Sequence, residues 1–81
     1  MNEVIDFFKG LGFKVSESNT NDFHFYMNLW INDVGQIDAQ GDSETVSMRL
    51  IGREPYDHAD FLASNKEGII KKIEDWKNGN W

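Results

Sequence analysis

The sequence contains no cysteine and a single proline among its 81 residues. Without a thiol the chain has no disulfide and no thiolate metal ligand, so a fold of this size depends on side-chain packing for its stability. The chain has no proline-rich or glycine-rich runs, which argues against a disordered chain. Apolar residues make up 40% of the sequence and aromatic residues 14%, which is enough for one packed core. We therefore expect a single domain over residues 1–81, in a reducing compartment.

Long hydrophobic runs are also missing. No stretch approaches the roughly 20 apolar residues that a membrane-spanning helix needs. The first residues include the acidic Glu3 and Asp6, where a secretory signal would be basic, and the apolar run around them is too short for export. These features predict a soluble, cytoplasmic protein.

Basic residues are few and unevenly distributed. The chain has 14 Asp and Glu against eight Lys and Arg, which gives a net charge of −6. Between Lys14 and Arg49 there is no basic residue, whereas Glu17, Asp22, Asp33, Asp38, Asp42 and Glu44 all lie in that interval. Most non-specific affinity for nucleic acid comes from cations that displace counterions, so this charge disfavours direct binding to nucleic acid or to an anionic membrane. It predicts a protein partner with a basic surface.

Apolar periodicity predicts two helices that flank a set of strands. Near the N-terminus Val4, Phe7, Phe8 and Leu11 follow one helical face, and Ile69, Ile70, Ile73 and Trp76 do so near the C-terminus. "SNKE" has the pattern of a capping box with Ser64 as the N-cap and Glu67 reaching back. The predicted elements are a helix over 3–11, strands over 13–17, 22–32, 36–40 and 45–51, and a helix over 65–77. The segment 52–63 has no clear period and is predicted as a loop with room for a short helix or strand, anchored by Tyr56, Phe61 and Leu62.

The predicted strands suit an antiparallel meander with one apolar face. A register that pairs Ile31 with Ile37 and Ala39 with Val46 aligns the inward residues. Both amphipathic helices then pack on that face. The predicted fold class is α+β, a two-layer sandwich in which an antiparallel meander of three to four strands carries the N- and C-terminal helices on one face, in the order α-β-β-β(-β)-α.

The stretch "DFHFYMNLWIN" at 22–32 predicts aromatic and polar side chains on the other face of the sheet. Its alternation places His24, Tyr26, Asn28 and Trp30 opposite the core set. Trp, Tyr and Arg are enriched at binding hot spots, so this face predicts a partner-binding surface. The alternative is that Tyr26 and Trp30 only stabilise the sheet through cross-strand pairs, or lie under segment 52–63 or Trp81. The residues expected to flank the aromatic set are Gln36, Asp38, Gln40, Thr45, Ser47, Arg49 and Ile51.

Carboxylates are expected to gather beside this face. In the predicted register, loop 18–22 and turn 41–44 share one end of the sheet and bring Glu17, Asp22, Asp42 and Glu44 together. The segment "GDSET" lacks the alternating oxygen ligands of a calcium loop, so no metal site is predicted. We interpret these carboxylates as partner-binding, against the alternative of ordinary solvated turn residues.

No catalytic signature stands out. "YDHAD" brings Asp57, His58 and Asp60 close in sequence, but two carboxylates and one imidazole in a loop are weak evidence for a metal site or a general base. A turn-capping role for Asp57 or Asp60 is the simpler interpretation. The glycines match no phosphate loop, and no serine has the setting of a nucleophile. We expect no enzyme activity and no cofactor.

These features favour a small acidic protein-binding module that inhibits or regulates a basic, nucleic-acid-handling partner. In size and charge the chain resembles phage anti-CRISPR and other counter-defence proteins and the immunity proteins of nuclease toxins, although no motif carries that resemblance. The element order also resembles the double-stranded RNA-binding domain, but the basic residues that recognise RNA in that family are absent. The alternative is a homo-oligomeric accessory protein, such as a homodimer, that self-associates through its aromatic sheet face.

Overall fold

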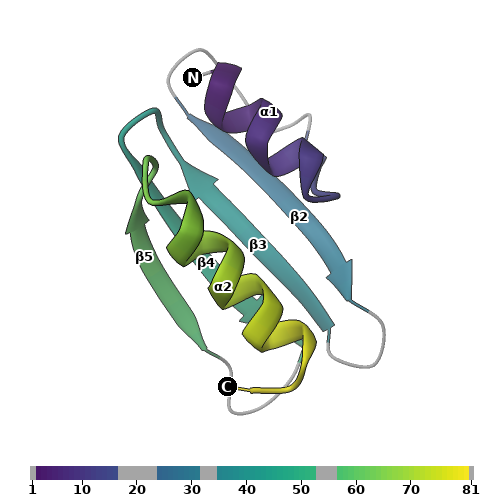
Figure 1. Cartoon of the computed structure of the whole chain (residues 1–81). Coiled ribbons are helices and arrows are strands. Elements are labelled where there is room, and N and C mark those ends of the chain that lie inside the picture. The colour runs from purple at the N-terminus through teal and green to yellow at the C-terminus, as the bar shows by residue number, and fades with distance from the viewer. Residues whose placement is uncertain (1, 17–23, 32–34, 53–56, 81) are drawn as a thin grey trace.

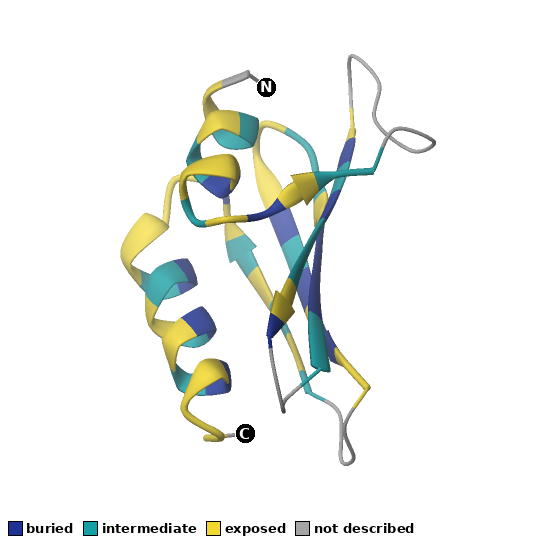
Figure 2. Ribbon diagram, turned by 90° about the vertical axis from the view of Figure 1, so that its right-hand side faces the viewer, coloured by how far each residue is buried: buried dark blue, intermediate teal, exposed yellow. Residues whose placement is uncertain are grey.

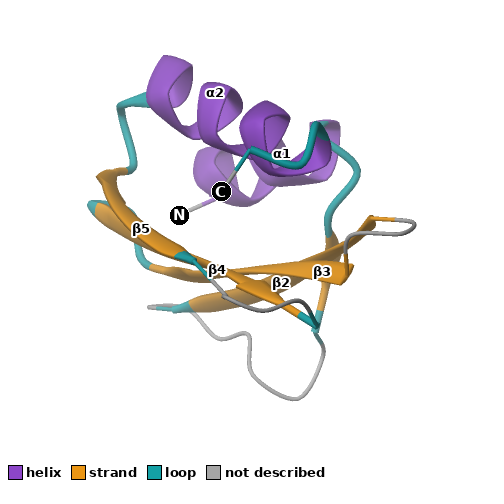
Figure 3. Ribbon diagram, turned by 90° about the horizontal axis from the view of Figure 1, so that it is seen from below, coloured by secondary structure: helices purple, strands orange, loops and turns teal. Residues whose placement is uncertain are grey.

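Two helices pack on one face of an antiparallel sheet (Figures 1 and 3). The computed structural model describes residues 2–16, 24–31, 35–52 and 57–80. The strands follow one another in sequence order across the sheet, with β1 and β5 at its edges. This arrangement confirms the predicted α+β class, with a five-stranded sheet in place of three to four strands. The elements are α1 (Asn2–Gly10), β1 (Lys14–Val15), β2 (Phe25–Ile31), β3 (Gly35–Gly41), β4 (Thr45–Ile51), β5 (His58–Leu62) and α2 (Lys66–Lys77).

Helix α1 ends in a glycine-dependent turn. Gly12 has a φ of 100°, a conformation that favours glycine. Its N–H donates to the carbonyl of Lys9 at 3.0 Å, while the N–H of Phe13 donates to the carbonyl of Phe8 at 3.1 Å. These two bonds form a Schellman motif, and the aromatic contact between Phe8 and Phe13, with ring centroids 5.1 Å apart, supplies its hydrophobic part. The turn therefore directs the chain from α1 back onto the sheet.

Helix α2 begins one residue later than the capping box predicts. Asn65 is the N-cap, and its side chain accepts the backbone N–H of Gly68 at 3.1 Å. Ser64 is exposed and lies in the turn before the helix, so its prediction as the N-cap is wrong. Asn is at least as good a cap as Ser because its side-chain oxygen reaches the same backbone donors. At the other end Gly79, with a φ of 80°, terminates the helix as predicted.

The core lies between the helices and the inner sheet face (Figure 2). Along β2 and β4 the buried residues alternate with more exposed ones, as the period of two predicts. Helix α2 contributes its predicted stripe, including the fully buried Trp76. The buried core residues are Phe8, Phe13, Phe25, Met27, Ile31, Ile37, Ala39, Val46, Met48, Leu50, Ala63, Ile69, Ile73 and Trp76.

The strand registers differ from the predicted ones by two residues. Ile37 pairs with Leu29 and not with Ile31, and Ala39 pairs with Met48 and not with Val46. In the second hairpin the cause is the side chain of Asp42, which accepts the backbone N–H groups of Glu44 and Thr45 at 2.8 and 2.9 Å and so centres the turn one residue later. A shift of two residues leaves every side chain on its predicted face.

Segment 52–63 contains the fifth strand. Residues His58–Leu62 form β5, which pairs with β4 and extends the sheet. Phe61 packs against the core, whereas Leu62 is 64% exposed, so the prediction that Leu62 anchors this segment is wrong. Leu62 faces outward because it follows Phe61 in the alternation of the strand. Only two inward apolar residues, Ala59 and Phe61, mark this alternation in the sequence, which is too few to predict it. The predicted anchor Tyr56 lies outside the described residues.

Candidate partner-binding face

The sheet face opposite the helices, here called the outer face, is a lattice of polar and aromatic side chains. Within the described ranges no element covers it (Figure 3). The strand registers arrange its residues in rows across the sheet. One row contains Trp30, Gln36 and Ile51; the next contains Lys14, Asn28, Asp38, Arg49 and His58; the next contains Tyr26, Gln40, Ser47 and Asp60; the last contains Thr45 and Leu62. Asp42 adjoins this last row, because its N–H donates to the carbonyl of Thr45 at 3.0 Å.

Trp30 is the most exposed large apolar residue of this face. Its side chain is 69% exposed, so the alternative in which Trp30 lies buried under another segment is not what the structure shows. Ile51, in the same row, is 40% exposed. Gln36 lies between them on β3. Trp30 and Ile51 therefore give one end of the outer face an apolar character.

Asp38 is the centre of a hydrogen-bonded cluster in the middle of the outer face. The residue is only 3% exposed. It accepts a hydrogen bond from the hydroxyl of Tyr26 and another from the amide of Gln36 at 2.7 Å. The hydrogen bond to Asp38 raises the pKa of Tyr26, because the carboxylate favours the protonated phenol, while the charge of Arg49 acts in the opposite direction. The cluster holds the Tyr26 ring in a fixed, half-buried position.

The outer face is less acidic than the sequence interval suggests. Lys14 pairs with Asn28 across β1 and β2, and Arg49 pairs with Asp38 across β3 and β4. The two cations that bound the acidic interval in the sequence thus lie in the same row of the sheet, on either side of Asp38. Lys14 was not predicted as a residue of this face. In "FKVS" the apolar Phe13 and Val15 alternate with Lys14 and Ser16, and this alternation is the signal that places Lys14 on the outer side of the strand.

Two of the four carboxylates predicted to cluster lie within the described residues. Asp42 and Glu44, here called the turn carboxylates, lie at the β3–β4 turn, whereas Glu17 and Asp22 lie outside the described residues. The backbone donors of Thr45 and Glu44 lower the pKa of Asp42. Asp42 therefore has a structural role in the turn, and Glu44 is exposed. A hollow of about 580 Å³ beside them is lined by His24, Phe25, Tyr26, Gln40, Gly41, Asp42, Thr45 and Ser47.

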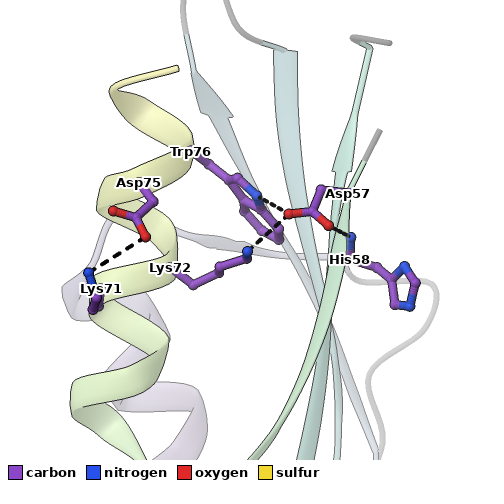
Figure 4. A network of polar contacts seen from close by, with 6 residues as sticks. All are labelled: Asp57, His58, Lys71, Lys72, Asp75 and Trp76. Atoms are coloured by element: carbon purple, nitrogen blue, oxygen red, sulfur yellow. Dashed lines mark hydrogen bonds and ion pairs between the residues drawn. The ribbon is translucent and has the colours of Figure 1, made fainter. Parts of the chain in front are cut away.

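Asp57, His58 and Asp60 do not come together. Asp57 points toward α2, where its carboxylate accepts the indole N–H of Trp76 at 3.1 Å and pairs with the ammonium of Lys72 at 3.0 Å (Figure 4). These two contacts lower the pKa of Asp57. His58 points away from α2 (Figure 4), and Asp60 accepts the hydroxyl of Ser47 at 2.6 Å. Asp57 faces α2, whereas His58 and Asp60 share the outward parity of β5, and each carboxylate has a structural partner.

No group of three or more His, Asp or Glu side chains among the described residues is arranged to hold a metal ion. No helix in the same part of the chain is long and apolar enough to cross a membrane.

Comparison of the chain with protein-family models, with curated proteins and with solved structures found no match.

Proposed function

We propose that the chain is a non-enzymatic protein-binding module whose outer face docks on a partner with a basic surface, and that it inhibits or regulates a partner that handles nucleic acid. The observation that carries this proposal is the 69% exposure of Trp30 on a sheet face that no described element covers. A large exposed aromatic side chain is a typical hot spot, because it buries much area at a small cost in side-chain entropy.

The charge distribution supports a particular orientation of the partner. The turn carboxylates lie at one end of the outer face, and the apolar pair Trp30 and Ile51 lies at the other. The row that contains Lys14 and Arg49 separates the two ends. A basic region of the partner is therefore expected over the turn carboxylates, where it gains electrostatic attraction, and an apolar region over Trp30.

The hydrogen-bonded cluster around Asp38 supports binding by a pre-formed surface. Tyr26 is held by its hydroxyl and Asp38 is shielded from solvent. Less conformational entropy is lost on docking when the contact side chains are already fixed. This part of the outer face is therefore expected to bind without rearrangement.

The test is affinity capture from the lysate of the native host, followed by binding measurements with the purified partner. Trp30→Ala is expected to keep the fold and to weaken binding by about 2 kcal/mol, which is roughly 30-fold. Leu62→Ala is expected to weaken binding much less, since Leu62 is 64% exposed but lies at the opposite end of the outer face from Trp30, on the edge strand β5. Glu44→Gln should mainly slow association and reduce its dependence on salt.

Several results would contradict the proposal. Equal binding by the wild type and Trp30→Ala would exclude the outer face as the docking surface. A partner that keeps its full nucleic-acid activity in the complex would contradict the inhibitory or regulatory role. Unfolding of Trp30→Ala would show that the aromatic set is structural.

The second candidate is a homo-oligomeric accessory protein that self-associates through the outer face. The presence of Trp30 and Ile51 in one row favours it, because the exposed apolar residues of two such rows could cover each other about a two-fold axis. Light scattering at several concentrations distinguishes the two candidates. A dimer that Trp30→Ala dissociates would favour self-association over a heterologous partner.

A further inference from the structure

The open edge of the sheet at β5 is a second surface, separate from the site of Trp30. β5 pairs with β4 on one side, and no strand in the described part of the chain pairs with it on the other. It forms the lateral border of the molecule in Figure 1, beyond α2. The opposite edge strand, β1, has only two residues. β5 is therefore the longer of the two edge strands.

The backbone groups of His58, Asp60 and Leu62 point away from β4. The residues with the other parity bond to the β4 side, since the carbonyl of Asp57 accepts the N–H of Leu50 at 2.8 Å and the N–H of Ala63 donates to the carbonyl of Glu44 at 2.7 Å. In an antiparallel strand alternate residues direct their N–H and C=O groups to opposite sides. The edge thus presents the carbonyls of the three even-numbered residues and the N–H groups of Asp60 and Leu62, while the N–H of His58 donates to the carboxylate of Asp57 at 2.9 Å.

β5 lacks three features that commonly prevent edge-to-edge pairing. Such edges often carry lysine, proline or a bulge. The sequence of β5 is HADFL, and its register with β4 is continuous from His58 to Leu62. Its one carboxylate, that of Asp60, points to the outer face, where it accepts the hydroxyl of Ser47.

We propose that β5 pairs antiparallel with β5 of a second copy of this chain, about a two-fold axis at Ala59. In this register His58 of each copy lies opposite Asp60 of the other. The N–H of Asp60 donates to the carbonyl of His58, and the N–H of His58 exchanges its bond to the Asp57 carboxylate for one to the carbonyl of Asp60. Their side chains lie on the same face and have complementary chemistry, since an imidazole can donate to a carboxylate. The small side chain of Ala59 suits the axis, where the two strands bring facing residues closest together.

The neighbouring symmetric registers are less favourable. An axis at Asp60 places two carboxylates directly opposite each other, which is destabilising. An axis at Phe61 places His58 opposite Ser64, which belongs to the turn after β5 and is not extended. Of these three registers, the axis at Ala59 is the one that places complementary side chains opposite each other within β5, at residues 58–60.

The resulting dimer would leave the outer face accessible. Trp30 lies on β2, on the far side of β3 and β4 from the proposed junction. The two sheets would join into one continuous sheet, with two outer faces side by side. Because the edge and Trp30 are separate surfaces, a dimer through β5 does not depend on the proposed partner-binding function, and either one can be refuted without the other.

The test is sedimentation analysis of the full chain over about a hundredfold range of concentration. We expect the wild type to show a monomer–dimer equilibrium. Asp60→Pro removes an N–H that points away from β4, so the internal sheet keeps its hydrogen bonds. It should raise the dimer dissociation constant by at least about tenfold, while Asp60→Asn, which retains the N–H, should raise it less.

The register has its own test in a residue exchange. His58→Asp alone is expected to weaken the dimer, because it places two carboxylates opposite each other across the junction. His58→Asp combined with Asp60→His should restore it, because the pair is recreated with its members exchanged. Failure of the double variant to recover would overturn the axis at Ala59.

Amide hydrogen exchange of the wild type is independent of any variant. The amide of Asp60 should become more protected as the concentration of the chain rises, whereas that of His58 already donates to Asp57 in the monomer. The inference is overturned by a wild type that stays monomeric over the whole range, by amide exchange that does not change with concentration, or by a dimer that Trp30→Ala dissociates and Asp60→Pro leaves intact. The last result would identify the outer face as the dimer interface.

Discussion

Removal of the Asp57 carboxylate should loosen the attachment of α2 to the sheet. Asp57 lies just before β5 and reaches the helix through the indole N–H of Trp76 and the ammonium of Lys72. Trp76 is fully buried, so Asp57→Ala leaves a buried donor without its acceptor, which costs about 1–3 kcal/mol. The ion pair, about one third exposed at both side chains, adds about 0.2–1 kcal/mol. We expect Asp57→Ala to lower the free energy of unfolding by about 2–3 kcal/mol.

The assay is urea-induced unfolding followed by far-UV circular dichroism at neutral pH. Lys72→Met is the matched control, because it removes the charge but keeps most of the apolar stem over Trp76, and it should cost less than about 1 kcal/mol. Asp57→Asn retains an acceptor for the indole and should fall between the two. The reasoning is refuted if Asp57→Ala costs no more than Lys72→Met, since the hydrogen bond to Trp76 would then contribute nothing beyond the ion pair.

The same contact gives a pH dependence with a defined sign. The ammonium of Lys72 and the indole of Trp76 lower the pKa of Asp57 below its ordinary value of 3.8. A lowered pKa in the folded state means that the unfolded chain binds the proton more tightly, so the stabilisation is complete above the unfolded pKa and is lost as the pH falls through the folded one. Asp57→Asn should therefore lose less stability than the wild type between pH 5 and pH 3. Some acid sensitivity should remain, because the pKa of Asp42 is lowered as well.

Two further predictions test the backbone of the fold by the same unfolding assay. Gly35→Ala should lower the free energy of unfolding by about 2 kcal/mol or more, because a Cβ there would lie 2.2 Å from a backbone oxygen of β4 and the φ of 125° suits glycine. Gly10→Ala is the control. A Cβ at Gly10 meets nothing within 4 Å, so this variant should be neutral or stabilise the protein by up to about 1 kcal/mol. Asn65→Ala should cost about 1 kcal/mol through loss of the N-cap, whereas Ser64→Ala should change stability by only a few tenths; equal effects at both positions would contradict the observed cap.

The layer architecture was predictable because it depends on patterns that act locally. The period of two in β2 and the helical stripe that ends at Trp76 each determine which side of an element is apolar. Two elements with one apolar side have few ways to bury it, so the placement of both helices on one sheet face followed. Tyr26 and Trp30 lie on the outer face for the same reason, as predicted from the alternation of β2.

The features that the sequence did not predict depend on hydrogen bonds of single side chains. The turn carboxylate Asp42 centres the second hairpin by accepting two backbone N–H groups, and this choice shifts the register by two residues. Asn65 displaces Ser64 as the helix cap in the same way. Each alternative differs by about 1 kcal/mol or less, which a pattern of apolar residues does not resolve.

The charge of the outer face illustrates why a linear count misleads in a sheet. The interval from Lys14 to Arg49 is anionic in the sequence, yet antiparallel pairing returns its two ends to one row, where both cations flank the shielded carboxylate of Asp38. A partner that only needed negative charge would find it at the β3–β4 turn and not across the face. The proposed docking orientation, with a basic region at that turn and an apolar region over Trp30, therefore depends on pairing geometry, and reversing the charge of Lys14 should affect binding less than neutralising Glu44.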